Sequence, residues 1–84
     1  MENPTWLITA NIKITLDARP LLTTGNHPLE KVIAEAGSLN PGEIYEIITP
    51  FPPLPMIEKV AVLGFDSFSE QKEDNLFHTF FCRL

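Results

Sequence analysis

The chain opens with a strict alternation of apolar and other side chains. Every second residue from Trp6 to Leu16 is apolar, and the residues between them are mostly polar. A period of two predicts a β-strand with one buried face. The run is long for a single strand, so a bend or bulge is expected at Asn11. The segment 17–20 ends the strand, because Pro20 cannot continue a central ladder.

Two later segments have apolar residues at helical spacing. The first stripe contains Leu29, Val32, Ile33 and Ala36, and the second contains Ile57, Val60 and Ala61. Pro28 and Pro55 suit the first turns of these helices, where a missing N–H has no consequence. Gly37 is expected in the left-handed conformation after the first helix, and the second helix is expected to end near Gly64. Residues 21–28 are predicted to form a loop.

Three further segments are predicted to be strands. The segment Glu43–Thr49 is short and rich in β-branched and aromatic residues, and the run Pro50–Pro55 ends it. Phe65–Gln71 and Leu76–Leu84 follow as a pair, joined by a turn at residues 73–75. Because that connection is tight, the last two strands are expected to be antiparallel.

The resulting order is βαβαββ, which predicts an α+β fold. The compact solution is a two-layer α/β sandwich, in which a mixed four-stranded sheet carries both helices on one face. The two early crossovers should be right-handed and join parallel strands. Eighty-four residues suffice for one domain, residues 1–84, with one core. The predicted core contains Ile12, Ile14, Leu16, Leu29, Val32, Ile33, Ile57, Val60 and Phe80.

The last strand carries apolar residues on both faces. Arg83 is expected to point away from the helices, which places Phe77 and Phe81 on the open face of the sheet, beside Tyr45. An exposed apolar patch of this kind marks an interface. The alternative is that the N-terminal segment folds across the open face and covers it. Phe51, in the proline run, packs locally or adds to the exposed apolar surface; the run itself is a rigid crossover loop or a polyproline ligand.

Composition and charge narrow the function classes. The chain has 44% hydrophobic residues and a formal charge of −5, and no apolar stretch approaches the length of a membrane span. Its six basic residues are scattered, which argues against nucleic acid as a partner. The N-terminus lacks the features of a secretory signal, and the lone Cys82 suits a reducing, cytoplasmic setting.

Candidate polar sites are few. The loop from Arg19 to His27 precedes a helix N-terminus and could bind a small anion through the side chains of Arg19, Thr23, Thr24, Asn26 and His27. The alternative is that these side chains cap the helix and that Arg19 pairs with Asp17 or Glu43. His78 and Cys82 lie too far apart along a strand to share one metal ion, so no metal site is expected. No nucleophile–base arrangement or phosphate-binding glycine loop is present, so we expect no catalytic residues and no cofactor.

The segment LDARPLLTTGNHPLEKV, followed by LNPGEIYEI, resembles the SirA/TusA-like family of small sulfur-carrier proteins. The resemblance covers roughly residues 12–84 and implies the same βαβαββ fold. The family's sulfur chemistry depends on a Cys-Pro-x-Pro motif at the start of the first helix. Thr23 stands where that cysteine would lie, and a hydroxyl cannot carry a persulfide. The chain therefore resembles the uncharacterised branch that lacks the cysteine.

These observations favour a small non-catalytic interaction module on a SirA/TusA-like scaffold. It would bind a protein partner, or itself as a weak homodimer, with no role for nucleic acid or membrane. The alternatives are a divergent sulfur-relay or redox accessory protein, and a small-anion binder at the first helix N-terminus.

Overall fold

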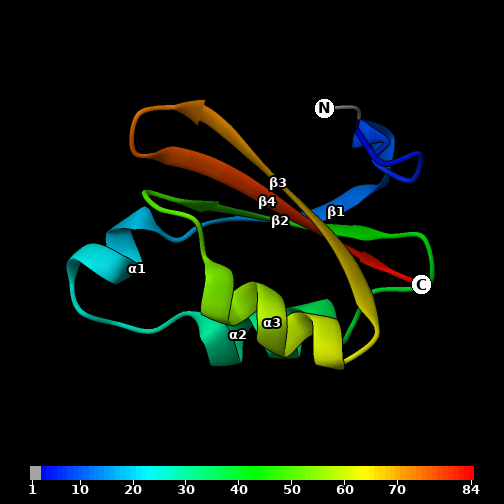
Figure 1. Cartoon of the computed structure of the whole chain (residues 1–84). Helices are drawn as coiled ribbons and strands as arrows, with labels where there is room; N and C mark the ends of the chain where they lie inside the picture. The colour runs from blue at the N-terminus through cyan, green and yellow to red at the C-terminus, as the bar shows by residue number, and fades with distance from the viewer. Residues whose placement is uncertain (1–2) are drawn as a thin grey trace.

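A computed structural model describes residues 3–84 as a helical layer against a four-stranded sheet (Figure 1). The strands are β1 (Ile12–Asp17), β2 (Ile44–Thr49), β3 (Phe65–Glu73) and β4 (Leu76–Arg83). The helices are α1 (Arg19–Thr23), α2 (Leu29–Ala36) and α3 (Leu54–Val62), and a 3-10 turn, η1 (Thr9–Asn11), precedes β1. Helices α2 and α3 lie against one face of the sheet, and α1 lies where β1 ends (Figure 1).

The sheet is mixed, as the sequence predicts. Its strand order is β1-β2-β4-β3: β1 and β2 are parallel, and β4 is antiparallel to both of its neighbours. Strands β2 and β3 are therefore parallel to each other, with β4 inserted between them. The prediction of an α+β fold with a mixed four-stranded sheet is confirmed.

The N-terminal alternation does not form one continuous strand. The amide of Asn11 donates a hydrogen bond to the carbonyl of Ile8, which closes the 3-10 turn η1, and β1 begins only at Ile12. The change of direction falls at Asn11, where the sequence predicts it. A register shift between Ile12 and Ile14 then leaves Lys13 as a bulge opposite β2.

Two local expectations are wrong. Residues 19–23 form α1, although a loop was predicted from residue 21; the Thr23 hydroxyl donates to the carbonyl of Arg19 and stabilises this turn. Gly37 has a φ of −63° and is not left-handed. Its carbonyl accepts a hydrogen bond from the Arg83 guanidinium, so a carbonyl group at the C-terminal end of α2 has a partner without a left-handed residue.

The main core lies between the sheet and the helices. Its buried residues are Ala18, Val32, Ala36, Leu39, Tyr45, Ile47, Met56, Val60, Phe65 and Phe81. Of the predicted core, Val32 and Val60 are fully buried, and Ile14, Leu16, Leu29 and Ile57 pack against this cluster while partly exposed. Ile33 is only half-buried. Ile12 and Phe80 are in a separate cluster on the other face.

The predicted open-face aromatic patch is wrong. Tyr45 and Phe81 have no exposed surface and lie in the main core under the helices, and Phe77 is half-buried opposite Thr49. Arg83 shares their face because its guanidinium reaches the C-terminal end of α2, where carbonyl groups favour a positive charge. The Tyr45 hydroxyl donates to Glu35 at 2.7 Å. Burial, assisted by this bond, raises the pKa of the Tyr45 phenol.

A second, smaller cluster covers the outer face of the sheet. It comprises Ile44, Phe80 and Cys82, with Trp6, Leu7, Ile12 and Phe68 packed against them. The N-terminal segment therefore crosses the face opposite the helices (Figure 1), as the alternative expectation stated. The Trp6 indole N–H anchors this segment by donating to Asp66 at 2.8 Å. In the described part of the chain, no helix is long and apolar enough to span a membrane.

Candidate functional site

A pocket of about 300 Å³ opens where the parallel strands β1 and β2 end. It is lined by Leu22, His27, Pro28, Leu29, Thr49, Phe51, Pro53, Pro55 and Met56. Of these side chains, only His27 and Thr49 carry polar atoms. The carboxyl ends of adjacent parallel strands are a common place for ligand sites, since the connections that follow them diverge there.

Prolines fix the walls of this pocket. Pro28 is the N-cap of α2 and is buried, Pro53 is the buried N-cap of α3, and Pro55 lies in the first turn of α3. The Thr49 hydroxyl donates to the carbonyl of Phe51, which holds the loop after β2 against the strand end. A ligand would therefore meet a wall that loses little conformational freedom on binding.

Of the predicted anion-binding residues, His27 lines this pocket and the other four do not. Arg19 forms a two-pronged pair with Asp17 at 2.6 and 2.9 Å, and this hydrogen bonding lowers the pKa of the Asp17 carboxyl. The Thr23 and Thr24 hydroxyls donate to α1 carbonyls, and the Asn26 amide donates to the Thr24 hydroxyl. These donors are engaged within their own segment, and anion binding stays a prediction.

Two of the residues chosen from the sequence do meet at the pocket. His27 comes from the α1–α2 connection and Phe51 from the loop after β2, and both line the cavity. Sequence reasoning missed Leu22, Leu29 and Met56. Leu22 lies in a segment that was predicted to be a loop, and its apolar side chain close to the end of β1 was the local signal of its role.

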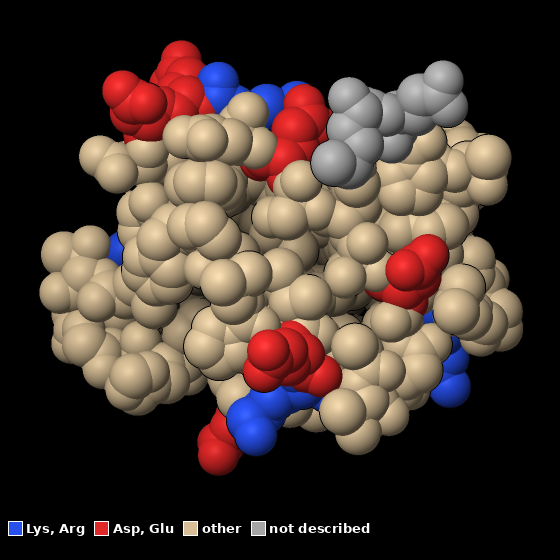
Figure 2. All heavy atoms as spheres, viewed as in Figure 1, with Lys and Arg blue, Asp and Glu red and all other residues tan. Residues whose placement is uncertain are grey.

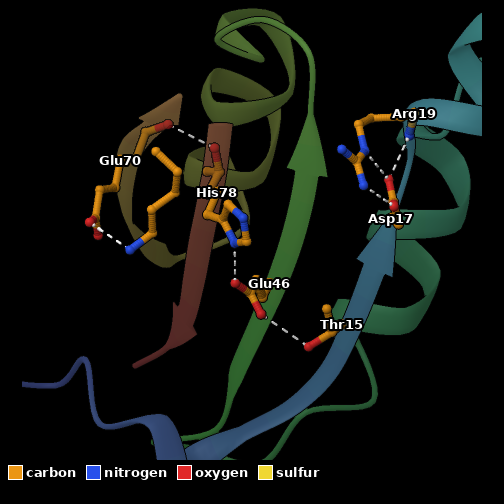
Figure 3. Close-up of polar contacts among 9 residues, drawn as sticks. Thr15, Asp17, Arg19, Glu46, Glu70 and His78 are labelled. Atoms are coloured by element: carbon orange, nitrogen blue, oxygen red, sulfur yellow. Dashed lines mark hydrogen bonds and ion pairs between the residues drawn. The ribbon is translucent and has the colours of Figure 1, made fainter. Parts of the chain in front are cut away.

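A polar row crosses the outer face of the sheet (Figure 3). His78 on β4 contacts Glu46 on β2 through Nδ1 at 2.6 Å, and the other Glu46 oxygen accepts from the Thr15 hydroxyl at 3.1 Å. The His78 and Glu46 side chains are 21% and 14% exposed. No local sequence pattern indicates this contact, because it depends on the β2–β4 register. The row lies outside the pocket lining, so we assign it a role in joining three strands.

Charge is distributed unevenly over the surface. On the face seen in Figure 2, acidic side chains gather at the β3–β4 turn, and the side over α1 and the proline-rich loop is almost free of charge. Phe51 and Leu54 are 47% and 61% exposed beside the pocket. The pocket therefore opens on an apolar, weakly charged surface.

Comparison with known proteins gives no family for this chain: no family model, curated protein or solved structure matches it.

Proposed function

We propose that this domain is a small non-catalytic interaction module that binds an apolar side chain of a protein partner in the pocket at the ends of β1 and β2. The observation that carries the proposal is the lining of the pocket, which is apolar apart from His27 and Thr49. The hydroxyl of Thr49 is already bonded to the Phe51 carbonyl, so it presents no unsatisfied group to a ligand.

The energetics suit a short apolar anchor. Full burial of a leucine or phenylalanine side chain contributes about 1.5–3 kcal/mol. Contacts of the flanking peptide with the exposed Phe51 and Leu54 would add to this. The surrounding surface carries little charge, so the approach of an apolar segment requires little desolvation of ionic groups.

A SirA/TusA-like scaffold remains our hypothesis for the origin of the domain. A sulfur-relay role would need a reactive thiol, and Cys82 does not suit it. The thiol is 1% exposed, lies on the outer face of the sheet, and has a pKa raised by burial and by Asp66. Thiolate formation, on which such reactivity depends, is therefore disfavoured.

Selection of peptides from a random display library tests the pocket directly. We expect the wild-type domain to enrich sequences with one invariant Leu, Phe or Trp. Pro55→Glu should weaken the selected peptides at least about tenfold, because it places a carboxylate on the pocket wall. The domain should stay folded, since a carboxylate is favoured in the first turn of α3.

The matched control is Ala61→Glu, which adds the same charge to an exposed position of α3 outside the pocket. Its peptide affinity should equal that of the wild type. If no apolar anchor is enriched, or if both variants weaken binding equally, the proposed function is wrong.

A further inference from the structure

One polar group is buried in the wall of the pocket at the ends of β1 and β2. Thr49 is the last residue of β2, is 1% exposed and lines the pocket. Its hydroxyl donates to the carbonyl of Phe51, which is also a lining residue, so the oxygen lies between two parts of the wall. A hydroxyl has one hydrogen and two lone pairs. The Thr49 oxygen can therefore accept a hydrogen bond from a ligand, but it has no hydrogen left to donate.

The other polar side chain of the lining is in a different environment. His27 lies in the α1–α2 connection and is exposed, so its ring nitrogens remain accessible to water. A ligand that fills the pocket excludes water from the buried Thr49 oxygen. Unless the ligand brings a donor, the lone pairs of this oxygen stay without a partner, which is unfavourable. The buried oxygen therefore favours a ligand with an N–H or O–H group over an apolar ligand of the same shape.

Most of the remaining lining consists of rings. Five of the nine lining residues are cyclic: His27, Pro28, Phe51, Pro53 and Pro55. Met56 adds a thioether to the same wall. Aromatic rings pack favourably against other aromatic rings, and a thioether sulfur makes favourable contacts with a ring. The lining therefore favours an aromatic side chain over a branched aliphatic one.

We propose that the occupant of the pocket is a tyrosine or tryptophan side chain of the protein partner, whose O–H or N–H donates to Oγ1 of Thr49. The inference rests on the proposed function and names the class of side chain that the pocket takes. Both side chains combine an aromatic body with a polar tip, so one ring contacts the cyclic lining and the buried acceptor together. A pocket of about 300 Å³ is at the small end of the range for ligand sites, which fits a single side chain.

The lining discriminates against other side chains that carry a donor. Lysine and arginine have N–H groups, but no carboxylate lines the pocket, so a buried cation would have no counter-charge. Serine and threonine have an O–H group but little apolar surface to bury. Leucine and phenylalanine fill the pocket without a donor. Tyrosine and tryptophan satisfy both requirements.

A matched series of peptides tests the donor on the wild-type domain. A peptide selected from the display library is made with tyrosine, phenylalanine or O-methyltyrosine as the anchor, and each affinity is measured by titration calorimetry. Tyrosine should bind about three- to tenfold more tightly than phenylalanine, as expected for a neutral hydrogen bond. O-methyltyrosine keeps the oxygen without its hydrogen and should bind no better than phenylalanine. For a tryptophan anchor, the matched ligand is benzothienylalanine, in which sulfur replaces the N–H. Equal affinities within both series would overturn the proposal.

Substitution of Thr49 tests whether it is the acceptor. Thr49→Val keeps the shape of the side chain and removes the oxygen, so the tyrosine peptide should lose its advantage over the phenylalanine peptide. Thr49→Ser retains a hydroxyl and should retain the advantage. The measured quantity is a ratio of two affinities, so a looser loop after β2 lowers both affinities and leaves the ratio informative. The peptide series on the wild type decides the question if Thr49→Val does not fold.

The matched control is Thr15→Val, the same exchange on β1 outside the pocket. It should leave both affinities unchanged. A tyrosine advantage that survives Thr49→Val, or that is lost in His27→Ala instead, would overturn the assignment of Thr49 as the acceptor.

Failure of this inference and failure of the proposed function give different results. If the library enriches leucine or phenylalanine anchors that Pro55→Glu weakens, the domain binds apolar side chains and only the inference about the donor is wrong. If the library enriches no anchor, both are wrong. Enrichment of tyrosine or tryptophan at the anchor position is the result that we expect.

Discussion

Replacing Phe81 by alanine is expected to lower the free energy of unfolding by about 3–5 kcal/mol. The side chain is fully buried between the sheet and the helices, where it packs in the same cluster as Val32 and Val60. Its removal loses the apolar burial and leaves a cavity that a rigid sheet cannot fill. For a domain of this size, each 1 kcal/mol corresponds to about 4–8 °C in Tm. Thermal and urea denaturation, followed by circular dichroism, would measure the loss.

The matched control is Phe51→Ala. Phe51 is the same residue type but is 47% exposed beside the pocket, so its substitution should cost well under about 1 kcal/mol. If Phe81→Ala unfolded at the wild-type midpoint, the assignment of Phe81 to the helix-covered face would be wrong. The original prediction of an open-face interface would then regain its basis.

Replacing Trp6 by alanine is expected to expose Cys82 to thiol reagents. Trp6 packs against Ile44, Phe80 and Cys82 on the outer face of the sheet and donates a hydrogen bond to Asp66. The substitution should therefore lower the free energy needed to detach the N-terminal segment by about 2 kcal/mol. Cys82 is 1% exposed, so its thiol reacts only when the N-terminal segment detaches from the sheet. A loss of about 2 kcal/mol corresponds to an increase of about thirtyfold in the labelling rate. Mass spectrometry of the modified protein over time would give this rate.

Ile8→Ala is the control for the same segment. Ile8 lies close to Trp6 in sequence but is 52% exposed and is not part of the outer cluster. Its substitution should leave the labelling rate near that of the wild type. A Trp6→Ala protein that labels as slowly as the wild type would show that the N-terminal segment does not protect the thiol.

The sequence was sufficient for the four strands of the sheet and for helices α2 and α3, but not for α1, which lies where a loop was predicted. The helical spacing of Leu29, Val32 and Ala36 survives in α2. The period of two survives only in part: Ile14 and Leu16 share the core face of β1, whereas Ile12 packs on the other face, across the bulge at Lys13. These patterns are local, and each reflects the burial of one face of one element. The mixed sheet followed from connection lengths, because a helix between strands requires a crossover and a tight turn requires a hairpin.

The facing of β4 could not be decided from the sequence. Both parities of that strand carry aromatic residues, since the helices cover one face of the sheet and the N-terminal segment covers the other. The facing of β4 was inferred from Arg83, which was expected to point away from the helices, and that inference was wrong. A positive charge at the end of a strand can lie on the core face when a helix terminus receives it, as the Gly37 carbonyl does here.

The pocket and the polar row depended wholly on tertiary structure. His27 and Phe51 are distant in sequence and line one cavity because β1 and β2 are parallel neighbours and end at the same edge of the sheet. His78 contacts Glu46 only because the β2–β4 register brings them near each other. The sequence by itself determined which segments become the four strands and helices α2 and α3, since periodicity and proline positions act locally. Only the packing of these segments decided which residues meet, because register and layer contacts join parts of the chain that no local pattern connects.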